Sequence, residues 1–182
     1  MLLSRIQPIV ASDVIIAFSP SFFRVSGTSV TRLKGADHAG CFTKPLLKGI
    51  HRMSIKTQAY FILLGVCDSD EYPKHLTTPV YHSTTAALMN INGGGLFSAK
   101  KELVKNTTPQ PGQELSAEAD LEKRTLHFFI DGVQQQHHFV NIPVPLVFAI
   151  DAYHCDVPID ITFWGEETQS HVTFEGTGHN LG

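Results

Sequence analysis

Short apolar runs, broken by glycine and proline, fill most of the chain, and almost none of them has the spacing of an amphipathic helix. Glycine (14) and proline (10) recur along the 182 residues and separate segments rich in β-branched and aromatic side chains. Ten of these segments are predicted as strands: 14–18, 29–33, 51–56, 59–66, 86–91, 115–121, 126–130, 139–142, 147–152 and 160–164. Many short strands bounded by turn signals predict an all-β, antiparallel sandwich or barrel.

The clearest element is a hairpin within RTLHFFIDGVQQQ, residues 124–136. One face of its first strand is strongly apolar and consists of Leu126, Phe128 and Ile130. Asp131-Gly132 follows directly, and Asp-Gly is favoured in two-residue hairpin turns that need positive φ at both positions. Strict pairing would place Gln135 and His137 on the apolar face, so the returning strand is expected to bulge or to leave the ladder early.

Domain organisation follows from the same pattern. Residues 1–170 are predicted to form one β-sandwich domain, and residues 171–182 a C-terminal segment or tail. The last eight residues, EGTGHNLG, lack an apolar pattern and are expected to fray. The stretch SAKKELVKN is compatible with a single helical turn.

Composition narrows the function classes. The chain is 42% hydrophobic, with 14 basic against 17 acidic residues and a net charge of -3, and no basic stripe indicates a nucleic-acid partner. No apolar run approaches the ~20 residues of a membrane helix, so no membrane association is expected. The three cysteines, Cys41, Cys67 and Cys155, are widely spaced without a CxxC pair. They are read as reduced thiols of an intracellular protein that is expected to be cytoplasmic.

The acidic stretch EADLE offers the clearest case for catalysis. Glu118, Asp120 and Glu122 alternate with apolar residues and therefore share one strand face, as in the Glu-x-Asp-x-Glu signature of jelly-roll β-glucanases. Retaining glycosidases hold their two carboxyl groups ~5 Å apart, whereas positions i and i+4 of a strand lie ~13 Å apart. The single tryptophan, Trp164, provides no sugar platform beside the motif. These acids are therefore predicted to be a solvent-facing polar surface, dispensable for folding, and the chain is not predicted to be an enzyme.

Metal and cofactor signals are weak. CDSDEY, with Asp68, Asp70 and Glu71, resembles a calcium loop but lacks the glycine and the distal glutamate of an EF-hand. The adjacent His137 and His138 point to opposite faces of a strand, so they do not converge on one zinc ion. No cofactor and no metal site are predicted.

Several motifs together resemble the SPRY domain family. DLEKRTLHFFIDG, followed by FVNIPVPLVFAIDAY, is similar to the family's acid, charged turn, Thr-Leu-x-Phe strand, Gly-containing turn and Pro-Leu strand. LLKGIHRMSIKT resembles its Gly-x-His-x-Trp-x-Ile strand, and AYFILLGVCDSD its Ile-Gly-Val strand. The resemblance covers about residues 5–165 in the correct order. It implies a two-sheet antiparallel β-sandwich of concanavalin A-like, jelly-roll shape and a non-catalytic module that binds another protein through loops at one edge.

The binding surface is expected on two loops, because strands of a sandwich hold position while loops recognise partners. The first loop, 68–85, is unusually long for a connection without strands. The second, 151–160, follows a strand at which family members often place a ligand-contacting aromatic residue. The predicted partner-binding residues are Tyr72, His75, Tyr81, His82, Thr84, Asp151, Tyr153 and His154. A protein or peptide partner is expected, bound either transiently or within a larger assembly. A carbohydrate-binding lectin and, less well supported, a glycoside hydrolase built on EADLE remain the alternatives.

Overall fold

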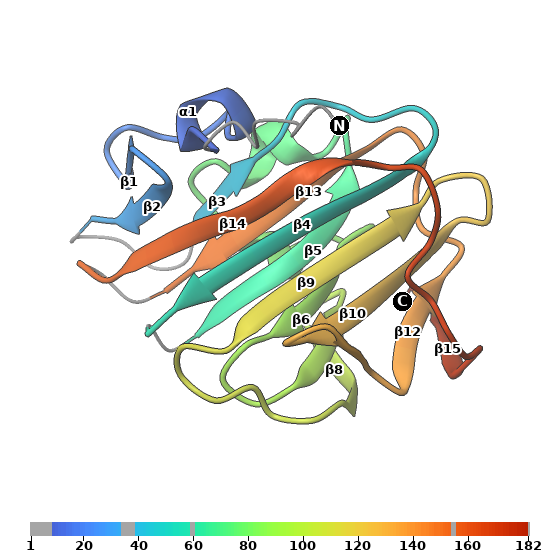
Figure 1. The fold of residues 1–182 in the computed structure, drawn as a ribbon. Coiled ribbons are helices and arrows are strands. Elements are labelled where there is room, and N and C mark those ends of the chain that lie inside the picture. The colour runs from blue at the N-terminus through green and yellow to red at the C-terminus, as the bar shows by residue number, and fades with distance from the viewer. Residues whose placement is uncertain (1–8, 34–38, 59–60, 154–155, 182) are drawn as a thin grey trace, which may run out of the picture.

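Two β-sheets packed face to face form the molecule (Figure 1). The computed structural model describes residues 9–33, 39–58, 61–153 and 156–181. Within these, the larger sheet has nine strands in the order β1-β2-β14-β4-β9-β10-β12-β15, with β11 beside β10. Its strands are β1 (Phe23–Ser26), β2 (Ser29–Arg32), β4 (Ile50–Thr57), β9 (Glu114–Asp120), β10 (Thr125–Ile130), β11 (Val133–Gln134), β12 (His137–Val140), β14 (Pro158–Glu167) and β15 (Thr177–Asn180).

The smaller sheet has six strands in the order β3-β13-β5-β6-β7-β8. They are β3 (Ala39–Phe42), β5 (Ile62–Asp68), β6 (Ala87–Asn90), β7 (Gly95–Ser98), β8 (Lys101–Lys105) and β13 (Leu146–Ala152). Neighbouring strands in both sheets run antiparallel, apart from the parallel pair β12 and β15. The predicted all-β, two-sheet antiparallel sandwich is confirmed.

Alternating side chains from the facing surfaces of the two sheets form the main core. The larger sheet contributes, among others, Met53, Ile55, Leu115, Ala117, Leu126, Phe128 and Ile130. The smaller sheet contributes Leu64, Val66, Met89, Phe148 and Ile150. The predicted apolar face of the 126–130 strand therefore points into the interior, as a period of two requires.

The hairpin at β10 confirms its sequence signal. Asp131 and Gly132 both have positive φ, 47° and 78°, as the Asp-Gly turn predicts. Strand β11 follows β10 only as far as Gln134, which pairs with Phe129. The register shifts before β12 resumes the pairing. The expected early departure of the returning strand is thus confirmed, and it carries Gln135 out of the regular ladder.

The predicted strand at 14–18 is wrong. A short helix, α1 (Ala11–Val14), includes its first residue, and the following segment makes only an isolated bridge between Ala17 and Phe42. Ala11 and Val14 are three residues apart and both buried, so a helical turn places them on one face. Two 3-10 helices, η1 (Tyr72–His75) and η2 (Val80–His82), are also short. Within the described residues, no helix is long and apolar enough to span a membrane.

The stretch SAKKELVKN, which is compatible with a helical turn in sequence, instead contains a hairpin turn followed by strand β8. Ala99 and Lys100 form the turn with φ of 49° and 67°. Neither residue type favours positive φ, so the sequence carries no glycine signal for this turn. Strands β1, β3 and β7, of four residues each, also lack a clear pattern and were not predicted.

Residues 177–180, near the C-terminus, do not fray. Strand β15 pairs in parallel with β12 at the edge of the larger sheet (Figure 1). The expected loose tail is therefore wrong: the backbone of residues 177–180 is hydrogen-bonded into the sheet, although its side chains bury little apolar area.

Candidate functional site

The outer face of the smaller sheet is covered by the connection between β5 and β6. This connection contains η1 and η2 and corresponds to the loop predicted at 68–85. Beneath it lies a second apolar cluster that consists of Phe42, Leu63, Cys67, Val80, Ala86, Leu88, Val147 and Ala149. Strands β5 and β13 are thus buried on both faces, which explains their continuous apolar sequences.

Asp151 on β13 fixes the position of η2. Its side chain is fully buried, and Oδ2 accepts hydrogen bonds from the N–H groups of Val80 (2.7 Å) and Tyr81 (3.3 Å). A buried carboxylate without such donors would be strongly destabilising. Burial, together with the nearby negative charge of Asp151, raises the pKa of the Cys41 thiol, so this cysteine stays protonated. Through its hydrogen bonds to the backbone of Val80 and Tyr81, the buried Asp151 holds Tyr81 in place.

Glu71 fastens the far end of the same connection. Its Oε2 accepts hydrogen bonds from the hydroxyl groups of Ser83 (2.5 Å) and Thr85 (3.3 Å). The Ser83 hydrogen bond lowers the pKa of Glu71 below its ordinary value, because it stabilises the charged carboxylate. The connection is therefore a packed and hydrogen-bonded cover rather than an open loop.

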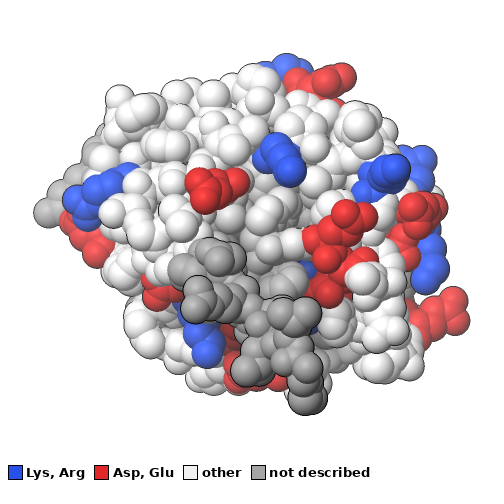
Figure 2. All heavy atoms as spheres, turned by 45° about the horizontal axis from the view of Figure 1, so that its top comes forward, with Lys and Arg blue, Asp and Glu red and all other residues white. Residues whose placement is uncertain are grey.

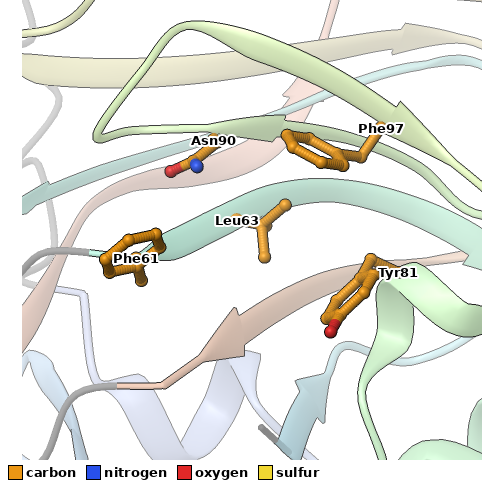
Figure 3. A pocket seen from close by; sticks show the side chains of 5 residues that line it. All are labelled: Phe61, Leu63, Tyr81, Asn90 and Phe97. Carbon is orange, nitrogen blue, oxygen red and sulfur yellow. The ribbon is translucent and has the colours of Figure 1, made fainter. Parts of the chain in front are cut away.

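Beside this cover the sheet surface is hollowed. The hollow has a volume of about 210 Å³, and Figure 3 shows the side chains that line it: Phe61, Leu63, Tyr81, Asn90 and Phe97. They come from β5 and the residue before it, from η2, and from the hairpin β6-β7. Its lining is mainly apolar and contains no charged side chain.

Asn90 is the one amide in the hollow. Its Oδ1 accepts the N–H of Asn92 at 2.9 Å, and this bond fixes the side-chain amide. Among the described residues Nδ2 has no hydrogen-bond partner, so it is a donor available to a ligand.

Two exposed aromatic rings extend the hollow. Phe61 and Tyr153 are 45% and 44% exposed, and their rings meet edge to face with centroids 6.2 Å apart. Exposed aromatic residues gathered in this way are typical of a binding surface.

On the face drawn in Figure 2, acidic and basic side chains are interspersed, without one continuous field of a single sign.

The partner-binding residues predicted on the first loop differ in burial, and one of them lines the hollow. Tyr81 lines the hollow. Tyr72 is half-buried and packs against Phe42, with ring centroids 5.3 Å apart. His75 is buried. Two members are exposed outside the hollow: His82 and Thr84.

The second loop divides in the same way. Asp151 is interior and positions η2, while Tyr153 lies at the rim of the hollow through its contact with Phe61. His154 lies outside the described residues.

Four hollow residues were not identified from the sequence: Phe61, Leu63, Asn90 and Phe97. Leu63 and Asn90 belong to strands β5 and β6, whose apolar sequences predict burial but do not show which part of an outer face stays uncovered. Phe97 lies on β7, which has no clear sequence pattern. The available signal was an Asn within the apolar segment ALMNI.

The acidic face predicted from EADLE is not solvent-facing. Glu118 and Asp120 are 1% and 6% exposed, because residues 170–172 pass over the sheet at this point. Both Glu118 oxygens are engaged, since they accept hydrogen bonds from Ser170 Oγ (2.7 Å), from the His171 backbone N–H and from the His171 ring. Glu122, in the following turn, remains exposed. The solvated-face prediction is therefore wrong for the first two acids.

Because Glu118 is a buried anchor, its substitution should no longer be neutral. We expect Glu118→Ala to lower the free energy of unfolding by about 1–3 kcal/mol, since it removes a buried acceptor of several hydrogen bonds. Urea unfolding measures this change, and the exposed Glu122→Ala is the control, expected within about 0.5 kcal/mol of wild type. Equal midpoints for the two variants would contradict the anchoring role.

The CDSDEY turn uses its carboxylates within the protein. Asp68 Oδ1 accepts the N–H of Asp70 at 2.7 Å, and Glu71 is bound to Ser83 and Thr85. Across the described ranges, no group of three or more His, Cys, Asp or Glu side chains is arranged to hold a metal ion.

These features define an antiparallel β-sandwich with an aromatic hollow on the outer face of its smaller sheet. The SPRY domain of human HERC1 matches the fold with a TM-score of 0.63 at 15% sequence identity, over 85% of this chain and 99% of that chain. A human SPRY domain matches with a TM-score of 0.63 at 11% identity, over 76% and 93% of the two chains. The TRIM65 PSpry domain gives 0.66 at 12% identity, over 83% and 90%.

The chain therefore has the fold of SPRY domains, as its motifs predicted. No protein-family model and no curated protein matches the sequence. At these identities the similarity is one of fold, in the arrangement of the strands.

Proposed function

We propose that this chain is a non-catalytic protein-interaction module that binds a protein or peptide partner at the hollow beside η2. The observation that carries the proposal is the exposed, mainly apolar hollow extended by Phe61 and Tyr153. Aromatic side chains provide most of the binding energy in many interfaces, because they bury large areas and lose little side-chain entropy.

The lining indicates the chemistry of the partner. Because no charged residue lines the hollow, the anchor is an uncharged aliphatic or aromatic side chain. The Nδ2 group of Asn90 is positioned to donate a hydrogen bond to a backbone carbonyl beside that anchor. The proposed ligand is therefore an extended peptide segment with one large apolar residue.

The connection between β5 and β6 preorganises the site for binding. Asp151 and Glu71 fix the connection that carries Tyr81, so little ordering is needed on binding. The SPRY-like fold supports a recognition role by analogy.

The same structure supports a module without catalysis. Glu118, one of the two candidate catalytic glutamates of the glycosidase alternative, has both oxygens bound by Ser170 and His171. Trp164 packs edge-on against the core residue Phe148. An intracellular setting is proposed on the free, buried thiols of Cys41 and Cys67.

Substitutions in the hollow should weaken partner binding without unfolding the module. We expect Phe97→Ala and Tyr153→Ala each to reduce affinity by about 1–2 kcal/mol, as for aromatic hot spots. Proteins captured on the immobilised wild-type chain are compared with those captured on each variant by quantitative mass spectrometry. The affinity of each variant for a protein captured by wild type but depleted with the variants is then measured by titration calorimetry.

The matched control is Phe174→Ala. Phe174 is 43% exposed, close to the 44% of Tyr153, but follows β14 on the C-terminal segment. It should retain the same partner at full affinity. Full affinity in both hollow variants would refute the site. Binding of the wild-type chain to glycans on an array, lost in Phe97→Ala, would favour the lectin alternative.

A further inference from the structure

The C-terminal segment lies across the outer face of the larger sheet. In Figure 1 it leaves the end of β14, turns across the sheet and ends as β15 beside β12. Its first attachment is the anchor formed by Ser170 and His171 on Glu118. These contacts are polar, and the segment contributes little to the main core.

Gln134 makes the second attachment. Its Oε1 accepts the N–H of Thr173 (2.7 Å) and of Phe174 (3.3 Å), and its Nε2 donates to the Phe174 carbonyl oxygen (2.7 Å). One buried side-chain amide therefore satisfies the backbone of an extended segment, much as a neighbouring strand would.

Beyond this point the segment passes over histidines. His127 on β10 and His138 on β12 are 6% and 5% exposed, and their rings stack with centroids 4.1 Å apart. The backbone comes close to His138 at Gly178, where an added Cβ would lie 3.3 Å from Nε2 of His138 and 2.8 Å from a methyl group of Val140. On β15 itself, His179 contacts the ring of His137 through a 3.1 Å nitrogen–nitrogen pair.

In the described part of the chain, one nitrogen of each stacked ring has no hydrogen-bond partner. The Nδ1 atoms of His127 and His138 are buried and lack a hydrogen bond in the described part of the chain. A hollow of about 280 Å³ borders both rings and gives water a route to them.

Several charged or titratable groups face this pair. They are Asp120 on β9, Lys123 in the β9-β10 turn, His137 on β12, His179 on β15 and Glu175 in the segment itself. Asp120 is already bound to the backbone N–H groups of Glu122 and Lys123 and to Lys123 Nζ. Asp120 is therefore engaged elsewhere, and in the described residues neither carboxylate is hydrogen-bonded to the Nδ1 atom of either ring.

We propose that residues 174–180, which we term the latch, are held on the larger sheet while the stacked histidines are neutral and are released when acid protonates them. Two adjacent protonated rings repel each other across the stack, and opening hydrates both of them. Release uncovers the backbone edge of β12.

The direction of the pH dependence follows from proton uptake. Burial lowers the pKa of His127 from 6.5 to about 4 and also lowers the pKa of His138. Between pH 6.5 and 4 the open form therefore binds more protons, so the closed latch is fully stable above this window and loses stability as pH falls through it. For His127 alone, lowering pH from 7.5 to 5.0 shifts the equilibrium toward the open form about 30-fold.

The anchor responds differently. Two of the donors to Glu118, the Ser170 hydroxyl and the His171 backbone N–H, do not titrate in this pH range, so their hydrogen bonds do not depend on histidine protonation. Release is thus confined to the latch, and the Ser170–His171 attachment remains.

Hydrogen exchange of the full chain at pH 7.5 and 5.0, corrected for intrinsic rates, tests the latch. We expect the amides of residues 177–180 to lose protection about 30-fold or more at pH 5.0. The His171 amide and the amides of β4 and β9 should keep theirs. Unchanged protection in β15, or a loss shared equally with β4 and β9, would overturn the proposal.

A double variant ties the effect to the histidines. In His127→Gln/His138→Gln most of the pH effect on β15 protection should be lost, leaving only the smaller contribution of His179, whereas the exposed-site control His82→Gln should behave as wild type. An undiminished pH effect in the double variant refutes the assignment. If the double variant does not fold, the wild-type comparison alone decides.

Discussion

Replacing Phe128 by alanine should lower the free energy of unfolding by about 3–5 kcal/mol. The side chain is fully buried between the two sheets and meets Phe139 edge to face, with ring centroids 6.3 Å apart. Alanine removes most of this burial and leaves a void that the closely packed strands can only partly fill. Chemical unfolding with guanidinium, followed by fluorescence, measures the change.

The control for this prediction is Val133→Ala in the same hairpin. Val133 is 66% exposed at the turn, so its truncation should stay within about 0.5 kcal/mol of wild type. A loss below about 1.5 kcal/mol for Phe128→Ala would show that the core relaxes around the void far more than a rigid sandwich allows.

Removing the interior carboxylate in Asp151→Ala should lower the free energy of unfolding by about 2–4 kcal/mol, because two N–H groups at η2 lose their acceptor. The same change frees Tyr81 from its fixed position, so partner affinity should fall at least tenfold even where the domain remains folded. Thermal melts combined with titration calorimetry on the partner separate the two effects.

Asp151→Asn provides the graded comparison. Its amide oxygen can still accept the Val80 N–H, the shorter of the two bonds at 2.7 Å. Stability and affinity should therefore lie between those of wild type and Asp151→Ala. If Asp151→Ala has the same melting temperature as wild type, the position of the connection does not depend on this carboxylate.

Local signals predicted local structure well. The alternation in residues 126–130 and the Asp131-Gly132 turn each depend on neighbours in sequence, and both are confirmed. The turn at Ala99-Lys100 was missed because its positive φ values are imposed by the pairing of β7 with β8 and not by the residue types. Tertiary context overrides local preference at such positions.

The environment of EADLE could not be read from alternation. A period of two shows that Glu118 and Asp120 share a face, but not that a segment fifty residues later covers that face. The same limit applies to the hollow. Its residues come from four separate parts of the chain, and only Tyr81 and the adjacent Tyr153 were identified from the sequence.

Strand order also determines when the larger sheet can be completed during synthesis. Strand β14 lies between β2 and β4, yet it begins at residue 158, long after β2 ends at residue 32. At ribosomal elongation rates this interval lasts roughly 6–25 s. Throughout it the β1-β2 hairpin has no partner and β4 keeps an unpaired edge, so the nascent chain is exposed to aggregation and to chaperones until β14 emerges.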